Sequence, residues 1–383
     1  RGPSGQRREP PRWQLELCLR SDKDVGPRAN RRVSSLNLLN RLPVTAIPTW
    51  RSHTHMRILS SMSQSVGVVG ASGYAGAELV RLLDTHPEFE LAVATAASNA
   101  GQGVASLHPG LVALGSVTLQ SSTPEVLDGL DLVFIALPHG QSAALTAQLR
   151  GVARIVDLGA DHRLRDATDW DDYYGGGPAA EPWIYGLPEL PGRRDQVAGA
   201  TRVANPGCYA TALQLSAAPL LDAKLVDAAD IVAVAASGTS GAGRKASISL
   251  SATEVMGSMS AYKVGGLHQH TAEVVQELSA ISDRPVTMSF TPMLAPMPRG
   301  ILATTTMQIA EGVTANHVAD CVRSYYEHST FVHVLPQDMW PTTSATSATN
   351  CAHMQVVVDE RAGRVVVVAA IDNLGKGAAG QAI

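Results

Sequence analysis

The residue in this chain best placed for covalent chemistry is Cys208, in the stretch TRVANPGCYATALQL from Thr201 to Leu215. Proline lacks an N–H group and glycine is conformationally loose, so 205–207 (Asn-Pro-Gly) predicts a turn. The Ala- and Leu-rich segment 209–221 has apolar residues at helical spacing. Cys208 is therefore predicted to begin a helix, where unpaired N–H groups and the helix dipole favour the nucleophilic thiolate. The alternative is a buried apolar cysteine, which the adjoining turn and helix start disfavour.

Two histidines, His268 and His270, stand in the segment GGLHQHTAEV from Gly265 to Val274. Residues two apart share a face of an extended segment, so one of the pair would reach a substrate bound to the cysteine. A lone histidine is more often a hydrogen-bonded structural residue. A pair together with a separately argued cysteine predicts a general acid/base, and the spacing does not distinguish between the two.

A glycine-rich turn near the start of the folded region predicts a dinucleotide site. The β-branched run SVGVVG ends at Gly70, the turn continues through Gly73 to Gly76, and an amphipathic helix follows as far as Pro87. Strand, glycine turn and helix N-terminus together let the backbone approach and hold a pyrophosphate. The spacing is G-x-x-G-x-x-G, so the position between strand and helix carries the prediction more than the pattern does.

The second predicted strand, 90–96, bears on the choice of cofactor. NAD-specific sites place an acid at the end of this strand to bind the ribose hydroxyls. Here the strand runs into Ala97, Ser98 and Asn99, which are neutral and tolerate a 2′-phosphate. The sequence therefore favours NADP over NAD.

Two further buried strands, 131–137 and 154–158, complete a doubly wound parallel sheet. They end at Pro138-His139-Gly140 and at the loop 159–163, and ligands collect at such carboxyl ends. His139 is predicted to be a cofactor-side loop residue. Arg163 is predicted either to clamp an anion or to form a surface ion pair.

The second half of the chain predicts an antiparallel-rich α+β domain. Its strands are expected at 230–236, 285–290 and 300–309, with a hairpin formed by 354–358 and 365–371. The glycine loop 237–244 ends in Arg244 and is predicted either to cradle a phosphate or to be a plain surface loop. The Pro- and Met-rich link 292–299 ends in another cation, Arg299, and 169–191 is expected to be an ordered excursion over the site.

Bulk properties exclude several classes of protein. A chain of 383 residues with 45 % hydrophobic content favours two domains, and it has no apolar run long enough to span a bilayer. Its four cysteines have neither disulfide-framework nor zinc-site spacing, which indicates a reducing compartment and no metal. Residues 1–62 carry twelve Arg or Lys against four Asp or Glu, so the remainder has a net charge of −12, which argues against nucleic-acid binding by the folded body.

The basic leader 1–62 is expected to be unstructured and has two interpretations. It resembles an organellar transit segment, or it is upstream sequence preceding a true start at Met56 or Met62, which is the favoured interpretation. The predicted domains are a Rossmann-type domain of residues 63–207, completed by 374–383, and a catalytic and oligomerisation domain of residues 208–373.

Nine segments in order resemble the family of N-acetyl-γ-glutamyl-phosphate reductases, in the superfamily of aspartate-semialdehyde and glyceraldehyde-phosphate dehydrogenases. They are GASGYAGAELVRLL, ALPHGQSA, LGADHRL, YGLPELPG, NPGCYAT, SGTSGAGR, HQHTAEV, PRGILATT and DNLGKGAAGQA. The resemblance implies an NADP-binding Rossmann domain followed by an α+β domain of the glyceraldehyde-phosphate dehydrogenase C-terminal type. It implies cofactor contacts from Gly70, Ser72, Gly73, Tyr74, Ala75, Gly76, Ser98, Pro138, His139, Ser237, Gly238 and Asn373.

The implied reaction is the reduction of N-acetylglutamyl phosphate by NADPH, in arginine biosynthesis, with release of phosphate. Cys208 would form a thioester, His268 or His270 would act as acid/base, and Arg163, Arg244 and Arg299 are candidates for binding the substrate anions. A sister enzyme acting on aminoadipyl or aspartyl phosphate is the nearest alternative. A nucleotide-sensing regulator is another, disfavoured because it needs no such cysteine and histidines. A cytoplasmic homodimer or homotetramer is expected, or an organellar one if the leader is a transit segment.

Overall fold

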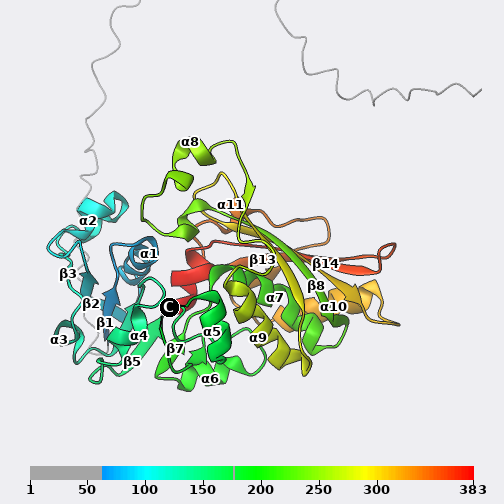
Figure 1. Ribbon diagram of the computed structural model, residues 1–383, viewed down its shortest axis with the longest axis horizontal. Helices are drawn as coiled ribbons and strands as arrows, with labels where there is room; N and C mark the ends of the chain where they lie inside the picture. Colours follow the sequence, from blue (N-terminus) through cyan, green and yellow to red (C-terminus); the bar gives the residue numbers. More distant parts are fainter. Residues whose placement is uncertain (1–62, 176) are drawn as a thin grey trace, which may run out of the picture. The chain divides into compact units, whose positions relative to one another are not determined.

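The computed structural model describes residues 63–175 and 177–383, and the predicted leader 1–62 lies outside the described residues. Two seven-stranded sheets organise the described chain (Figure 1). In these residues no helix is long and apolar enough to cross a membrane.

The first sheet is parallel throughout and has the strand order β3-β2-β1-β4-β5-β7-β6. Its strands are β1 Gln64–Val69, β2 Phe89–Ala96, β3 Gln120–Ser121, β4 Leu132–Ile135, β5 Arg154–Asp157, β6 Ile184–Tyr185 and β7 Arg202–Ala204. The helices of this half are α1 Tyr74–Leu83, α2 Val104–Leu107, α3 Pro124–Leu127, α4 Ser142–Thr146, α5 Ala167–Tyr173 and α6 Arg193–Gly199. The central strand β1 buries Val66, Val68 and Val69 completely, as its β-branched run predicted. The doubly wound prediction is confirmed.

The second sheet is mixed and has the order β12-β13-β14-β11-β8-β10-β9. Its strands are β8 Val226–Ser237, β9 Ser260–Ala261, β10 Met288–Leu294, β11 Ile301–Ile309, β12 Val332–Val334, β13 Ala352–Asp359 and β14 Arg364–Ile371. β11 pairs antiparallel with β8 and β14, whereas β8 and β10 are parallel. The predicted hairpin is the β13–β14 pair. The helices of this half are α7 Cys208–Asp222, α8 Ala252–Val255, α9 His270–Ser282, α10 Ala315–Tyr326, α11 Thr343–Thr346 and the terminal α12 Gly380–Ala382.

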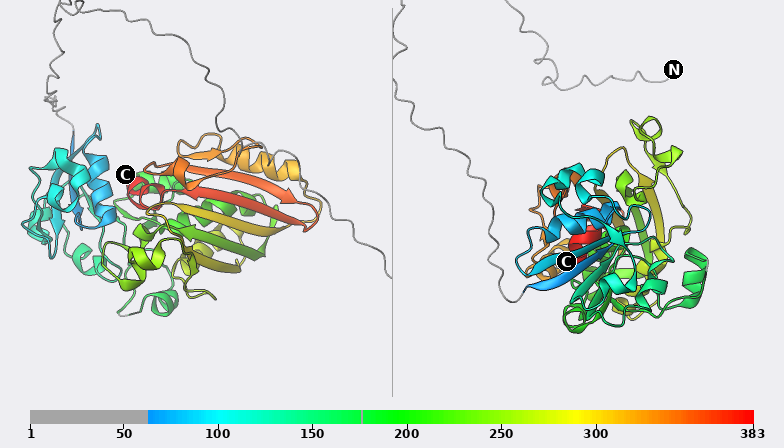
Figure 2. Two further views of the ribbon diagram at one scale, coloured as in Figure 1. Left: turned by 90° about the horizontal axis from the view of Figure 1, so that it is seen from above. Right: turned by 90° about the vertical axis from the view of Figure 1, so that its left-hand side faces the viewer.

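Helix α7 lies at the centre of the second core, with α9 and α10 beside it (Figures 1 and 2). All of 209–221 is buried, as expected of a helix apolar on every side. Pro219 lacks the N–H that would bond the carbonyl of Leu215, and the Tyr326 hydroxyl donates to that carbonyl instead, at 2.7 Å. Neighbouring elements of the second core therefore enclose the helix that begins at Cys208.

Two segments differ from the sequence-based expectation. The excursion 169–191 contains part of helix α5 and the edge strand β6. The Asp166 side chain caps α5 by accepting the N–H of Thr168. Strand β10 continues past Phe290 through Pro292, whose carbonyl accepts the N–H of Tyr262 at 3.2 Å, so the expected link begins later. The end of the chain, through the helical turn η5 Gly375–Ala379 and α12, packs Ala379 and Ile383 into the core of the first sheet.

Candidate active site

Cys208 is the first residue of α7, and Gly207 before it has an extended backbone. The position therefore matches the sequence-based expectation. No side chain caps the N-terminus of this helix, so its first backbone N–H groups have no side-chain acceptor there.

The turn that presents Cys208 is held by a buried carboxylate, Glu273 of α9. Its Oε1 accepts the backbone N–H of Gly207 at 2.7 Å and the Tyr185 hydroxyl at 2.6 Å. Its Oε2 pairs with Arg163 at 3.3 Å, and Glu273 is wholly buried. Arg163 also donates to the carbonyl of Asn205 at 2.7 Å. Arg163 and Glu273 thus bind the first and last residues of the turn 205–207.

Burial, rather than the helix dipole, dominates the protonation of the cysteine. It raises the pKa of the Cys208 thiol to about 11, and the lowering contributions of the Tyr209 N–H and the Arg163 charge do not offset it. The expectation that the helix start holds a resting thiolate is therefore corrected. For this sulfur to act as a nucleophile, a nearby base would have to take its proton.

Two buried histidine rings lie next to each other at the start of α9, with ring centroids 4.8 Å apart. Nδ1 of His268 accepts the backbone N–H of His270 at 3.1 Å, which leaves the proton of a neutral His268 ring on Nε2. Burial lowers the pKa of His268 to about 4 and that of His270 well below its ordinary value. Both rings are therefore neutral at pH 7.

His270 is the histidine that packs against the cysteine turn. A Cβ placed on Gly207 would lie 2.3 Å from His270 Nε2, so the imidazole occupies the space that only a glycine leaves free. The Nδ1 atom of His270 is buried and has no hydrogen-bond partner among the described residues. Among the described residues, no hydrogen bond at Nδ1 therefore fixes which nitrogen of this ring carries the proton.

The last turn of the chain closes the opposite side of the cysteine. A Cβ on Gly377 would lie 2.7 Å from the Cβ of Cys208. The next residue back, Lys376, is buried and pairs with Glu189, which anchors this helical turn. The thiol is thus confined between α9 and η5.

The glycine-rich turn after β1 has the form that a pyrophosphate needs. Gly70 has φ +82°, and a Cβ there would lie 2.3 Å from the carbonyl oxygen of Ala136. A Cβ on Gly76 would lie 2.2 Å from the carbonyl oxygen of Gly70, so both glycines are required by the fold itself. Gly73 meets only one atom, at 3.4 Å, and the α1 N-terminus that it begins has no side-chain cap and no acid in its first turn. These residues fit an anionic cofactor group.

The other expected cofactor residues surround the carboxyl ends of the first sheet. Ser72 to Ala75 form the turn and first helical residues, Ser98 is exposed after β2, and Pro138 and His139 are exposed after β4. The loop after β2 has no acid at Ala97 or Ser98. His139 contacts Tyr174 edge to face, with 5.1 Å between ring centroids.

The second domain contributes Ser237, Gly238 and Asn373 at the ends of β8 and β14. Asn373 accepts the N–H of Gly300 at 2.7 Å and donates to the Ser240 hydroxyl at 2.9 Å. This side chain therefore fixes the loop after β8 against the β11 start.

The three arginines proposed from sequence to bind substrate each have protein partners. Arg163 is buried and holds the cysteine turn, as described above. Arg299 pairs with Glu78 of α1 at 3.1 Å and with Asp372 at 2.9 Å. Arg244 donates to the carbonyl of Ser72 at 3.1 Å, so it lies beside the cofactor turn. Each of the three guanidinium groups is therefore already bonded to protein groups, and none is left free to bind a substrate at Cys208.

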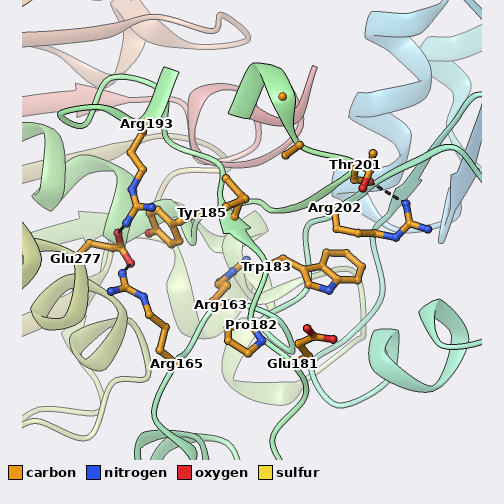
Figure 3. Close-up of a pocket in the computed structure, with 13 residues that line it drawn as sticks. Arg163, Arg165, Glu181, Pro182, Trp183, Tyr185, Arg193, Thr201, Arg202 and Glu277 are labelled. Atoms are coloured by element: carbon orange, nitrogen blue, oxygen red, sulfur yellow. Dashed lines mark hydrogen bonds and ion pairs between the residues drawn. The ribbon is translucent and has the colours of Figure 1, made fainter. Parts of the chain in front are cut away.

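A cavity of about 670 Å³ borders the hydrogen-bond network of Glu273 (Figure 3). Arg165 and Arg193 approach Glu277 from opposite sides, the latter at 2.5 Å. Arg163 and Tyr185 belong to both the cavity wall and the Glu273 network. Cys208, His268 and His270 do not line it, so it is separate from the cysteine site.

Sequence reasoning missed Glu273, Tyr185 and Gly377. Glu273 lies three residues after His270, and an acid in the apolar stretch TAEVV was a signal of burial. Its partners are 66, 88 and 110 residues distant in sequence, so no local pattern identifies them. Among the described residues no group of three or more His, Cys, Asp or Glu could hold a metal ion.

Two family models match the two halves of the chain. Residues 65–200 match the family model described as semialdehyde dehydrogenase, NAD binding domain. Residues 208–373 match the one described as semialdehyde dehydrogenase, dimerisation domain. A match to a nicotinamide-binding domain and a paired second domain identifies an oxidoreductase.

Solved structures with the same fold include aspartate semialdehyde dehydrogenase II of Vibrio cholerae, with a TM-score of 0.63 and 17% identity over 84% of this chain and 96% of that one. The enzyme of Candida albicans, solved with NADP, has a TM-score of 0.59 and 18% identity over 84% and 96%.

Much closer in sequence are curated proteins named N-acetyl-gamma-glutamyl-phosphate reductase. The one from Acidothermus cellulolyticus is 57% identical over 84% of this chain and 94% of its own length. The one from Salinispora arenicola is 56% identical over 84% and 93%. The chain therefore belongs to the N-acetyl-gamma-glutamyl-phosphate reductase family.

Proposed function

We propose that this protein reduces N-acetyl-L-glutamyl 5-phosphate to N-acetyl-L-glutamate 5-semialdehyde, with release of phosphate, as a step of arginine biosynthesis. The observation that carries the proposal is Cys208 at the start of α7 with His270 packed against the preceding Gly207. The cofactor-type glycine turn before α1 in the first domain supports it. The names of relatives at 50–57% identity support the same substrate.

In this proposal His270 is the acid/base and His268 positions it. The neutral His270 accepts the proton of the Cys208 thiol as the sulfur attacks the acyl carbon, and phosphate leaves. The thioester so formed holds the acyl group in place. Bound NADPH supplies the hydride that reduces this thioester. His270 then returns its proton to the Cys208 sulfur as the thiohemiacetal oxyanion collapses and the aldehyde is released.

The cofactor of the proposal is NADP(H), bound at the turn from Gly70 to Gly76. The support is the uncapped start of α1 and the absence of an acid at the end of β2, where Ser98 is exposed. Ser237, Gly238, His139 and Asn373 would lie along the nicotinamide end. Arg244, which reaches the carbonyl of Ser72, would serve the cofactor side rather than the acyl group.

We further propose the domain limits 63–207 with 374–383, and 208–373, and a homodimer or homotetramer formed through the second sheet. On β8, Val232 and Val234 are 39% and 38% exposed, whereas Ile231 and Ala233 are buried. An exposed apolar row of this kind suits a second copy of the sheet. Light scattering of the purified chain measures the assembly. The site of action proposed is the cytoplasm.

The decisive experiment follows the reverse reaction of the full chain. N-acetylglutamate semialdehyde, phosphate and NADP⁺ should yield NADPH, with NAD⁺ a much poorer acceptor. Aspartate semialdehyde and the aminoadipate analogue should be poor substrates. Preference for either of them over N-acetylglutamate semialdehyde would contradict the proposed substrate.

A further inference from the structure

Lys263 is a cation near the His268 and His270 pair that no carboxylate of the described residues neutralises. It lies in the segment 245–267, which leaves the second sheet after β8 and carries α8 (Figure 1). Its Nζ donates to Gln269 Oε1 at 2.7 Å, and among the residues that the structure describes no Asp or Glu forms an ion pair with it. The side chain is exposed.

Two anchors hold Lys263 beside the reacting groups. Tyr262, directly before it, donates its hydroxyl proton to the hydroxyl of Tyr209, which follows Cys208, at 3.1 Å. Gln269, which Lys263 contacts, lies between His268 and His270 in sequence and precedes α9. The residue before Lys263 is thus bonded to the cysteine helix, and the Lys263 ammonium is bonded to the residue between the two histidines.

The backbone around Lys263 has an unusual conformation. Lys263 itself has φ +45°, which an L-residue with a side chain rarely adopts, and Gly265 and Gly266 also have positive φ. The charge of Lys263 is felt by the buried rings, since it contributes to the lowered pKa of His268 and of His270.

We propose that Lys263 binds an oxyanion of the acyl phosphate substrate, orienting the acyl carbon toward Cys208. This proposal rests on the proposed function and completes it, because carboxylates neutralise Arg163 and Arg299, and Arg244 bonds to a carbonyl of the cofactor turn. A lysine ammonium suits a phosphate or a carboxylate equally as a point charge. The two oxyanions of one substrate are distinguished by experiment.

Steady-state kinetics of the reverse reaction test the proposal with the full-chain Lys263→Met variant. We expect the KM for phosphate or for the semialdehyde to rise about tenfold, the effect of one lost charge-assisted hydrogen bond, with the KM for NADP⁺ unchanged. A rise for phosphate assigns the phosphate, and a rise for the semialdehyde assigns its carboxylate. The KM of Lys263→Arg should lie close to the wild-type value, because arginine keeps the charge. Lys245→Met, which removes an exposed lysine of the same segment, should have the wild-type KM. The proposal would be overturned if the KM for phosphate and the KM for the semialdehyde are both unchanged in Lys263→Met.

A second measurement separates this proposal from the proposed function. Inorganic phosphate, or N-acetylglutamate as a carboxylate probe, should slow alkylation of Cys208 by iodoacetamide in the wild type and not in Lys263→Met. If the wild type shows this protection but does not turn over the semialdehyde, the proposed function fails and the anion site stands. If protection persists in Lys263→Met, the anion site is refuted whatever the turnover.

Discussion

Glu273 Oε1 accepts the backbone N–H of Gly207 at 2.7 Å, so a buried carboxylate of α9 fixes the residue that precedes the nucleophile. The same helix begins with His270, whose ring packs against Gly207. One helix therefore positions both the proposed base and the turn that presents the thiol. Arg163 supplies the counter-charge that makes burial of the carboxylate tolerable.

The Glu273→Gln variant tests this relationship. The amide keeps an oxygen for Gly207 but turns its NH₂ toward Arg163, which is left buried without a counter-charge. Loss of one member of a buried pair typically lowers the free energy of unfolding by about 3–5 kcal/mol. Urea unfolding followed by circular dichroism measures it. Glu254→Gln, at an exposed carboxylate, should change it by less than about 0.5 kcal/mol. Equal stabilities of the two variants would show that the pair does not hold the turn.

Gly377→Ala tests the confinement of the cysteine. The new methyl would lie 2.7 Å from the Cβ of Cys208, so the last turn of the chain or α7 must shift. We expect a loss of about 1–3 kcal/mol in the free energy of unfolding and a marked fall in turnover. The control is Gly110→Ala, because a Cβ at Gly110 meets nothing within 4 Å. Wild-type turnover by Gly377→Ala would mean that the thiol tolerates displacement.

Much of this architecture could be predicted from the sequence. There are physical reasons why the rest could not. The turn before Cys208, the glycine turn from Gly70 and the strand sets were predictable because each depends on neighbouring residues. The Glu273 network was not, because its contacts join segments far apart in the chain. The protonation of Cys208 was predicted wrongly: the local helix start is visible in sequence, but burial by α9 and η5, which raises the pKa, is not.

The pH dependence of Cys208 reactivity follows from its raised pKa. An unfolded thiol ionises near 9.0, whereas the folded one keeps its proton to about 11. Its contribution to stability is therefore present below pH 9 and is lost as the pH rises through 11. Alkylation of Cys208 in the free protein should be slow at pH 7 and rise roughly tenfold per pH unit toward pH 11. Peptide mapping separates it from the other cysteines. A rate that levels off below pH 8 would indicate a resting thiolate.

The most direct test of the central claim is a single-turnover experiment without phosphate. Wild-type protein mixed with NADP⁺ and N-acetylglutamate semialdehyde should form about one NADPH per chain and then stop, with the N-acetylglutamyl group carried as a thioester on the Cys208 peptide in mass spectrometry. Added phosphate should release the group and restart the reaction. Cys208→Ser should give neither burst nor adduct. A full burst in Cys208→Ser, or continuous NADPH formation by the wild type with no adduct, would contradict a covalent mechanism at Cys208.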